Sequence, residues 1–438
     1  MKLLPKTLAM LFLCIISLMC CGSYQPEEKV EIKLYYQNTV WLWNDNILLN
    51  QITNFEQWGK AQKNNRMGNR MQRVELVKEI NALGFSLEDS FEYVFYGIKE
   101  KINNICNFID KQAVDAKMDF NPNRIPVFKF TNEQIGYKID KDKLYLSILS
   151  ELENSNTIIL EIKPEILTPK IKLSDLKPLS NKLSSFSTSF ETSSESRKHN
   201  IRKSLECFNG MVLEPYKEYS FNQTTKRRTE ANGYKTANII VNEEYVEGVG
   251  GGVCQTSTTM YNALLMAGVE ILEVHPHSLQ SGYVMAGFDA MVNYGSSDLR
   301  WKNNTNSPIF IKTYTTNSKV YVEIFGKKTN NISLKRVNEL VKTLKAPQDK
   351  VIVDVDGEYQ DKVYYEDESF YKQYPKDGCI YKSYLEFWEN GKMIDKKKIR
   401  TQTYKPVQGV KIVGYHTRPE NSIEEFIDPN NLINSTEW

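Results

Sequence analysis

The chain has 438 residues, of which 41% are hydrophobic and 25% are charged. This composition excludes a disordered protein and is enough for two to four domains. Lysine plus arginine (56) nearly balances aspartate plus glutamate (54), so the formal net charge is only +2. Because this balance comes without a dense basic stripe, nucleic acid is not expected as a partner.

The N-terminus has the pattern of an export signal. Lysines precede an apolar run from Leu8 to Cys21, which is shorter than a membrane span usually requires. The run ends in Leu18-Met19-Cys20-Cys21-Gly22, which resembles a lipoprotein cleavage box with Cys21 as the lipidated residue. Cys20 competes for that role, and an uncleaved anchor is the alternative. We expect a leader at residues 1–21 and an extracytoplasmic protein, anchored to the outer face of the cytoplasmic membrane and facing the cell wall.

Residues 22–180 form a first predicted region of helices and strands. Apolar residues recur at helical spacing from Met71 to about Ala116, and the segment Ser86-Leu87-Glu88-Asp89 is typical of a helix start. Strand-like runs follow at 127–130 and 158–162. The sequence therefore predicts an α+β organisation for this region.

A linker and two further regions are predicted after it. Serines are frequent in 181–196, which favours a linker, although Phe186 and Phe190 indicate packing against another element. Residues 197–315 hold most of the motifs. Residues 316–438 alternate apolar and polar residues, and Glu389-Asn390-Gly391-Lys392 predicts a hairpin turn. We predict an α+β, multi-domain protein with a β-rich C-terminal region.

The most informative segment places one cysteine behind three consecutive glycines. Gly250, Gly251 and Gly252 lead into Val253 and Cys254, and the helical pattern that follows ends at Gly268. Cys254 would lie near a helix N-terminus, where the helix dipole favours a thiolate. Cysteines outside the leader are scattered and form no CxxC pair, so a disulfide framework is not expected and Cys106, Cys207 and Cys379 are interpreted as structural thiols.

A base for this thiol has to come from elsewhere in the chain. Two of the four histidines stand in His275-Pro276-His277, after a predicted strand at 269–274 that returns from the Cys254 helix. Strand alternation points both rings the same way, so either is a candidate base. Asp289 is the candidate that orients the imidazole in a Cys-His-Asp arrangement.

The order of these motifs resembles the VanW domain. The resemblance covers about 230 residues and is carried by Arg197-Lys198-His199-Asn200-Ile201, Tyr219-Ser220-Phe221-Asn222, Asn232-Gly233-Tyr234, Gly250 to Thr258, Tyr261-Asn262, His275-Pro276-His277-Ser278 and Asp289-Ala290. The preceding region, roughly 85–180, resembles a peptidoglycan-binding domain often found upstream of it. One departure is Glu214-Pro215-Tyr216-Lys217-Glu218-Tyr219, where the family usually has Pro-Gly.

The resemblance implies an exported cell-wall protein, and some family members are regarded as cysteine L,D-transpeptidases that join peptidoglycan stems through their third residues. Cys254 would be the nucleophile, and His277 the preferred base because the family has His-Ser there, with His275 in reserve. The remaining candidates are oxyanion donors and substrate contacts. The donors are the backbone at Gly251, Gly252, Val253 and Gln255, with the Gln255 side chain as a further donor, and the contacts are Arg228, Tyr234, Tyr283 and Lys302. The expected partners are stem peptides and, through the anchor, the membrane; no cofactor is expected.

Other interpretations of the same residues stay open. The glycines are also compatible with a plain turn next to a buried structural cysteine. A phosphate-binding loop is disfavoured because no Lys-Ser/Thr follows at the required spacing. Cys254, His275, His277 and Asp289 have the ligand types of a zinc site. The alternative function is a non-catalytic peptidoglycan-binding or scaffolding protein linked to glycopeptide resistance.

Overall fold

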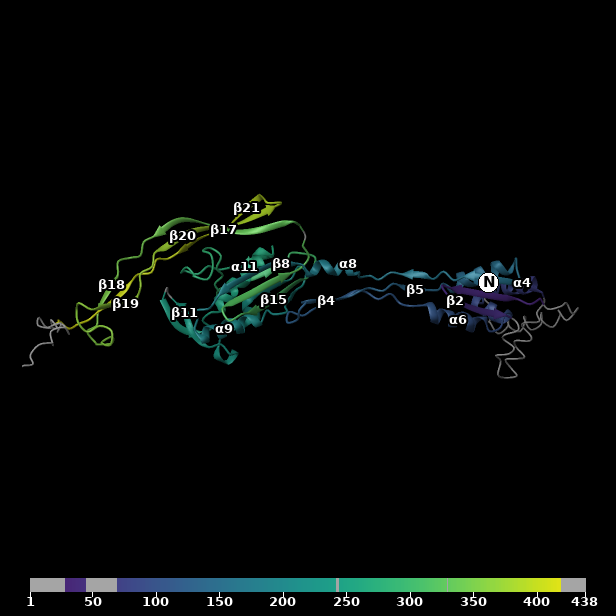
Figure 1. Cartoon of the computed structure of the whole chain (residues 1–438), viewed down its shortest axis with the longest axis horizontal. Helices are drawn as coiled ribbons and strands as arrows, with labels where there is room; N and C mark the ends of the chain where they lie inside the picture. The colour runs from purple at the N-terminus through teal and green to yellow at the C-terminus, as the bar shows by residue number, and fades with distance from the viewer. Residues whose placement is uncertain (1–27, 45–68, 242–243, 329, 419–438) are drawn as a thin grey trace, which may run out of the picture. The chain divides into compact units, whose positions relative to one another are not determined.

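The computed structural model describes residues 28–44, 69–241, 244–328 and 330–418 (Figure 1). The chain divides into two compact units, the first ending at Lys117 and resuming over Phe130–Leu173, and the second formed by Met118–Lys129 and the chain from Ser174 onward. The predicted leader and its lipidation site Cys21 lie outside the described residues. None of the helices within the described ranges combines the length and the apolar character that crossing a membrane requires.

The first unit packs helices against a small mixed sheet. Strand β1 is central, antiparallel to β2 and parallel to β6, and β5 pairs with β7. The bounds are β1 Glu31–Tyr36, β2 Thr39–Asn44, α4 Arg70–Ala82, α5 Leu87–Val94, α6 Ile98–Ile109, β5 Gly136–Lys138, α7 Lys141–Leu152, β6 Thr157–Glu161 and β7 Glu165–Leu167. The helices predicted between 71 and 116 are confirmed.

The sequence explains these helices locally. Ser86 caps α5 by accepting a hydrogen bond from the Asp89 N–H, as its position before the helical pattern predicts. Val74, Val77 and Ile80 recur on one face of α4 and are buried in the core of this unit. Burial of that apolar face, rather than helix propensity, holds the helix in place.

The core of the second unit is a four-stranded sheet in the order β8-β16-β15-β9, against which two helices pack (Figure 1). Helix α11 packs on β8 and β16, and α9 contacts both α11 and β15. The bounds are β8 Lys182–Ser189, α9 Glu195–Glu206, β9 Val212–Leu213, α11 Val253–Met266, β15 Ile309–Thr315 and β16 Lys319–Phe325. Helix α11 is buried over almost its whole length, which makes it the central element of this unit.

The serine-rich segment 181–196, predicted to be a linker, instead contributes strand β8 and the start of α9. Its small hydroxyl side chains let α11 approach closely, because Ser184 donates to the Ala263 carbonyl at 2.6 Å and Thr188 bonds Thr259 at 2.8 Å. The predicted boundary at 315/316 falls between β15 and β16, which are paired strands of one sheet.

Smaller elements complete this unit around the sheet. Strand β14 pairs with β10 and β13, and β11 forms a hairpin with β12. The bounds are β3 Lys117–Phe120, β4 Phe128–Thr131, α8 Leu173–Leu176, η1 Lys177–Ser180, β10 Glu218–Ser220, α10 Phe221–Thr225, η2 Glu230–Asn232, β11 Thr236–Val241, β12 Glu244–Val249, β13 Glu270–Glu273 and β14 Arg300–Lys302.

The C-terminal region consists of two three-stranded sheets, β17-β20-β21 and β18-β22-β19. Their bounds are β17 Ile332–Leu344, β18 Lys350–Val353, β19 Ser369–Gln373, β20 Gly378–Glu389, β21 Lys392–Tyr404 and β22 Val410–Val413. The turn predicted at 389–392 is confirmed, with Asn390 and Gly391 at positive φ (51° and 80°) as a two-residue hairpin requires. The mixture of segregated helices and mainly antiparallel sheets confirms the α+β class.

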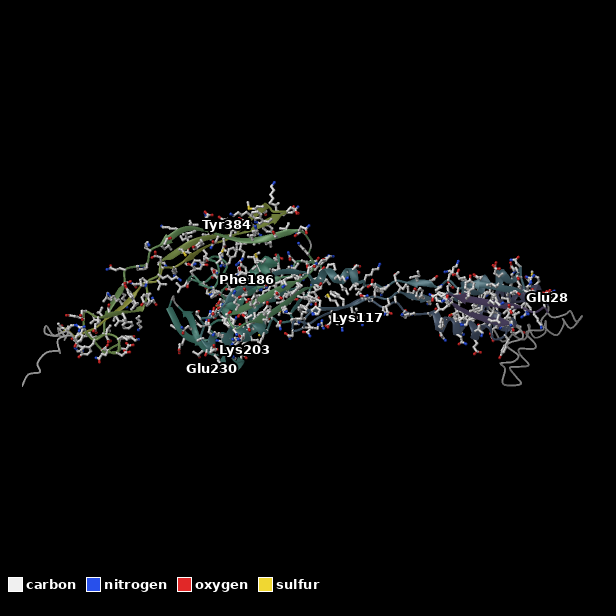
Figure 2. The ribbon with its side chains drawn as sticks, viewed as in Figure 1. Glu28, Lys117, Phe186, Lys203, Glu230 and Tyr384 are labelled. Atoms are coloured by element: carbon white, nitrogen blue, oxygen red, sulfur yellow. The ribbon has the colours of Figure 1, made fainter. Side chains whose placement is uncertain are left out.

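The β17-β20-β21 sheet packs against the core of the second unit. Figure 2 shows the side chains of both, with Phe186 on β8 and Tyr384 on β20 labelled. Arg336 of β17 lies over the Phe186 ring at 4.3 Å and hydrogen-bonds the Asn262 side chain of α11. The C-terminal sheet therefore contacts the same helix that carries Cys254.

Candidate active site

A glycine turn sets Cys254 on the first turn of α11. Gly252 is the N-cap residue with φ of +107°, a conformation that side chains rarely adopt. A Cβ at Gly252 would lie 2.9 Å from Arg197 Cγ, and one at Gly251 would lie 2.6 Å from the Asn238 carbonyl oxygen. Glycine is needed here because the turn packs directly on α9 and β11.

Side chains of the first predicted motif hold this turn. Asn200 of α9 donates from Nδ2 to the carbonyls of Lys235 (2.8 Å) and Gly251 (3.0 Å). Arg197 donates to Gln255 Oε1 at 2.8 Å, and Gln255 Nε2 donates to the Ser189 carbonyl at 2.7 Å. The Gln255 amide is therefore engaged in the scaffold at both ends.

The hydroxyl side chains after Cys254 fix a second segment beside α11. Ser257 Oγ donates to the Ala290 carbonyl at 2.6 Å, and Thr258 Oγ1 accepts from the Ala290 N–H at 3.0 Å. Asn262 Nδ2 donates to the Phe288 carbonyl at 2.8 Å. These bonds hold Asp289 against the helix that carries the thiol.

Cys254, His277 and Asp289 form one connected chain. Asp289 Oδ2 lies 2.8 Å from His277 Nδ1 and accepts the His277 backbone N–H at 2.6 Å. The His277 side chain interacts in turn with the Cys254 thiol, whose hydrogen bond at 3.5 Å runs to the Val292 carbonyl. Because Nδ1 faces the carboxylate, Nε2 is the nitrogen left for the sulfur, which is the orientation of a Cys-His-Asp triad.

His275 is directed elsewhere. Its Nε2 lies 2.8 Å from Glu273 Oε1, and its side chain is more exposed than that of His277. Strand β13 ends at Glu273, so the alternation that pointed both rings the same way does not continue through Pro276. Of the two candidate bases, only His277 reaches the thiol.

The charge distribution of the three groups favours a thiolate–imidazolium pair. Burial acts to raise the pKa of the Cys254 thiol, but the hydrogen bond and charge of His277, the Val292 backbone and Arg228 outweigh burial and lower it. Burial acts to lower the pKa of His277, but the bonds to Asp289 and Cys254 raise it. Burial opposes ionisation of Asp289 as well, yet His277 and Arg400 lower its pKa.

The thiol and the imidazole line one cavity of ≈ 1210 Å³. The glycine turn, the β11–β12 hairpin and the loop from His277 to Tyr283 form its walls. Arg228 and Tyr283, two of the predicted substrate contacts, lie on this lining. The other two do not: Tyr234 is buried with its hydroxyl 3.3 Å from the Thr225 carbonyl, and Lys302 lies on β14.

The predicted oxyanion donors are partly engaged by the turn itself. The Val253 N–H donates to the Gly250 carbonyl at 3.2 Å, and the Gln255 N–H donates to the Gly252 carbonyl at 2.9 Å. Between them, the Cys254 N–H meets no acceptor among the described residues. As one of the first N–H groups of a helix it also lacks an intrahelical partner.

Comparisons with known proteins identify the family of this chain. The family model for VanW like protein matches residues 196–325. A protein of Bacillus subtilis (strain 168), "Uncharacterized protein YoaR", is 32% identical over 205 residues, which cover 47% of this chain and 68% of that protein. The chain belongs to the VanW family. The vancomycin B-type resistance protein VanW of Enterococcus faecalis (strain ATCC 700802 / V583) is 22% identical over 139 residues, covering 31% of this chain and 50% of that protein.

Two solved G5-domain structures also match part of the chain. The crystal structure of HP0197-G5 is 13% identical, with a TM-score of 0.11, and covers 19% of this chain and 100% of that chain. The IgA1 protease G5 domain structure is 17% identical, with a TM-score of 0.13, and covers 20% of this chain and 98% of that chain. Likenesses at these TM-scores carry no argument about fold or function.

Residues outside the VanW match complete the surroundings of Asp289. Arg400 Nη2 donates to Asp289 Oδ1 at 2.8 Å, and the Tyr404 hydroxyl donates to the same oxygen at 2.7 Å. Gln402 donates to the His277 carbonyl at 3.1 Å. All three belong to β21, and no local motif in the sequence identifies them as partners of a site more than a hundred positions earlier.

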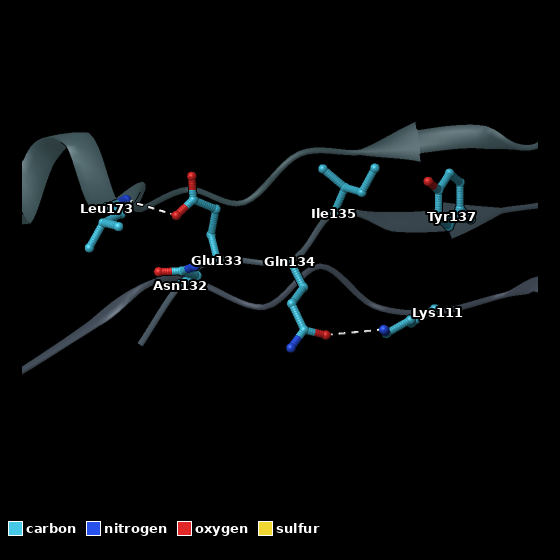
Figure 3. Close-up of a pocket in the computed structure, with 7 residues that line it drawn as sticks. All are labelled: Lys111, Asn132, Glu133, Gln134, Ile135, Tyr137 and Leu173. Carbon is cyan, nitrogen blue, oxygen red and sulfur yellow. Dashed lines mark hydrogen bonds between the residues drawn. The ribbon is translucent and has the colours of Figure 1, made fainter. Parts of the chain in front are cut away.

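Two other features of the described residues offer no competing site. The described residues contain no group of three or more His, Cys, Asp or Glu side chains that could hold a metal ion. A hollow in the first unit (Figure 3) is lined by polar side chains together with Ile135 and Leu173. There, Lys111 donates to Gln134 at 3.1 Å and Glu133 accepts the Leu173 N–H at 2.9 Å.

Proposed function

We propose that this VanW-family chain is a cell-wall enzyme, a cysteine L,D-transpeptidase that acts on peptidoglycan stem peptides. The observation that carries the proposal is the Cys254–His277–Asp289 chain on the wall of a peptide-sized cavity. The Enterococcus faecalis relative is named for vancomycin resistance, which supports a role at the cell wall. The lowered pKa of Cys254 supplies the nucleophile that acyl transfer needs.

In the first step, the Cys254 thiolate attacks the carbonyl carbon that joins the third stem residue to D-Ala. A C–S bond forms, and the negative charge moves onto the carbonyl oxygen. The Cys254 N–H at the start of α11 supplies the oxyanion donor in this proposal. The C–N bond then breaks, and His277 gives its proton to the departing D-Ala amine.

In the second step, a side-chain amine of a neighbouring stem attacks the thioester. His277 takes the proton from this amine, a new C–N bond forms, the C–S bond breaks and Cys254 leaves as the thiolate. Attack by water in place of the amine would release a carboxylate and make the reaction a carboxypeptidase step. In both reactions Asp289 keeps the imidazole in one orientation.

The cavity suits a substrate that carries carboxylates. Arg197, Arg227 and Arg228 line it, whereas Glu247 supplies an opposing charge. The two terminal nitrogens of Arg228 are buried and meet no hydrogen-bond acceptor among the described residues. The positive potential of these side chains would attract the carboxylates of a stem peptide, with Tyr283 forming part of the wall.

The location outside the cytoplasm is part of the same proposal. It is supported by the apolar run that ends at Cys21 and by a substrate class that lies in the wall. Fractionation of cells that carry the native chain or the Cys21→Ala variant tests the anchor. Loss of the membrane-associated form in the variant is the expected result.

The proposed reaction is tested with the chain from residue 22 and purified tetrapeptide stems. We expect an intact-mass increase for an acyl-enzyme with release of D-Ala, and cross-linked dimers when an acceptor amine is present. Cys254→Ala should abolish both, whereas Cys207→Ala, which removes another accessible thiol, should not. Binding of stems without acylation would contradict the enzyme and favour the peptidoglycan-binding scaffold.

A further inference from the structure

We propose that strand β21 is part of the reactive centre, and that Arg400 and Tyr404 are positioning residues that hold the Asp289 carboxylate for His277. This proposal concerns the charge relay itself and does not depend on which acyl group the thiol accepts. It assigns a role to a strand that lies outside residues 196–325, the segment that matches the VanW model.

The bonds around Asp289 form a complete shell. One oxygen, Oδ2, accepts from the backbone and the ring of His277, while Oδ1 accepts from Arg400 and Tyr404. The Asp289 side chain is only 1% exposed. With four donors and a side chain almost completely buried, the carboxylate has a single orientation and stays ionised.

Strand geometry explains how β21 supplies these groups together. Arg400, Gln402 and Tyr404 are two residues apart, so they lie on one face of the strand. Gln402 and Tyr404 are buried, whereas the intervening Thr401 and Thr403 are exposed. One face of one strand thus contacts both His277 and Asp289.

The Arg400 guanidinium serves Asp289 specifically. Nη2 bonds both the carboxylate, at 2.8 Å, and the backbone carbonyl of Asp289, at 2.7 Å. Its Nε and Nη1 atoms are buried and have no acceptor among the described residues. Burying a cation for a single residue is costly, and a well-packed apolar side chain would stabilise the fold as well. The arginine is therefore explained better by what it does to Asp289 than by packing.

Tyr404 links the carboxylate to the segment that carries it. Its hydroxyl donates to Asp289 Oδ1 and accepts the Gly287 N–H at 2.7 Å. Gly287 itself lies against Ser383 of β20, since a Cβ there would be 2.8 Å from the Ser383 Cβ. These contacts hold the segment that carries Asp289 close against the C-terminal sheet.

Other charged or titratable groups face the relay of Cys254, His277 and Asp289 and affect its ionisation. The thiol faces His277, Arg228 and Tyr283, and the carboxylate faces His277, Arg400, Tyr404 and Tyr261. Among the described residues, the arginine paired with the Asp289 carboxylate is Arg400, so its removal should weaken the relay strongly.

The test measures the rate at which iodoacetamide alkylates Cys254, located by peptide mass spectrometry, across pH 5–10 in the chain from residue 22 lacking the exposed Cys207. We expect Arg400→Ala to lower the rate at pH 7 about threefold, which corresponds to a tenfold loss of thiolate, and to move the profile to higher pH, because a charge-assisted bond to Asp289 is lost. Tyr404→Phe, which removes only the hydroxyl, should give a smaller change in the same direction. Arg400→Lys should recover most of the wild-type profile.

Two control variants distinguish loss of the contacts to Asp289 from a general loosening of the C-terminal sheet against the core. Arg336→Ala removes a second partly buried arginine of this sheet, which contacts Asn262, Phe186 and Phe288 and has no bond to the Asp289 carboxylate. Thr401→Ala changes the exposed face of β21. Both should keep the wild-type profile. Should Arg400→Ala fail to fold, Tyr404→Phe and Arg400→Lys decide the question.

An unchanged profile in folded Arg400→Ala or Tyr404→Phe protein overturns the proposal. An equal change in Arg336→Ala overturns it as well, since the effect would then report sheet packing. Because alkylation needs no peptide substrate, a failure of the transpeptidase assay leaves this result standing.

Discussion

Replacement of His277 by alanine is the sharpest test of the thiolate–imidazolium pair. The ordinary pKa of the thiol is 9.0, and burial acts to raise it. The side-chain bond to His277 is the largest contribution in the opposite direction. Without the imidazole, we expect the pKa of Cys254 to lie at or above its ordinary value, so that at most about one thiol in a hundred is ionised at pH 7.

The expected change in reactivity follows from this loss of thiolate. A thiolate formed at a higher pKa is a better nucleophile, with a Brønsted coefficient of about 0.4–0.5. Each tenfold loss of thiolate is therefore offset by about threefold, and the alkylation rate falls by roughly three- to fourfold for each tenfold loss. The variant should regain the wild-type rate only at alkaline pH.

The assay is stopped alkylation by iodoacetamide, with the modified residue located by peptide mass spectrometry. Cys207→Ser serves as the background because Cys207 is exposed, whereas Cys106 and Cys379 are buried. His275→Ala is the matched control, since that ring bonds Glu273. Equal pH profiles for His277→Ala and the background protein would refute the ion pair.

Three further outcomes are expected. Asp289→Asn should lower the free energy of unfolding in urea by about 3–5 kcal/mol, because Arg400 loses the charge that compensates its burial. The pKa of His277 is raised above 6.5, and that of Asp289 is lowered below 3.8. The stability lost in Asp289→Asn should therefore be greatest between pH 3.8 and 6.5. The loss should decline as the pH rises through the folded pKa of His277 or falls through the folded pKa of Asp289. Gly252→Ala should lower the midpoint of thermal unfolding, by at least the equivalent of about 1 kcal/mol, because φ is +107° and the added Cβ meets Arg197, while Gly295→Ala, also at positive φ but with no atom near its Cβ, should cost less.

The sequence predicted that Cys254, His277 and Asp289 lie together because their surroundings are local or belong to family motifs. The glycine run predicts a turn at the helix start, and a cysteine immediately after it lies beside the helix dipole. Asp289 and His277 were identified by motif order, and the hydroxyl side chains at 257 and 258 explain physically why that order places Asp289 beside the thiol.

The errors have physical reasons as well. Serine-rich composition suggests a flexible segment, but here small hydroxyl side chains lie under a close-packed helix, so tertiary contacts outweigh composition. Tyr234 and Lys302 were selected as substrate contacts from their chemistry alone. Tyr234 instead fills the core, and its pKa is raised to about 12 by burial. Nothing in the spacing of these residues reports which side of a strand or loop faces the cavity.

The partners of Asp289 could not have been predicted from the sequence, because they lie on a distant strand outside the segment that matches the VanW model. Arg400 is 111 residues from Asp289, and its own strand consists mostly of charged and polar residues with no motif that points to Asp289. Within residues 196–325 alone, Asp289 Oδ1 would lose the Arg400 and Tyr404 bonds and face water instead. Water around the carboxylate would screen its charge, so Asp289 would stabilise the protonated His277 ring less. The Cys254 thiol would then lose its proton less readily. In our proposal, the ionisation of Cys254 therefore depends on the second unit as a whole. The segment that matches the VanW model supplies the three candidate side chains, and the C-terminal sheet supplies the buried surroundings in which their charges interact strongly.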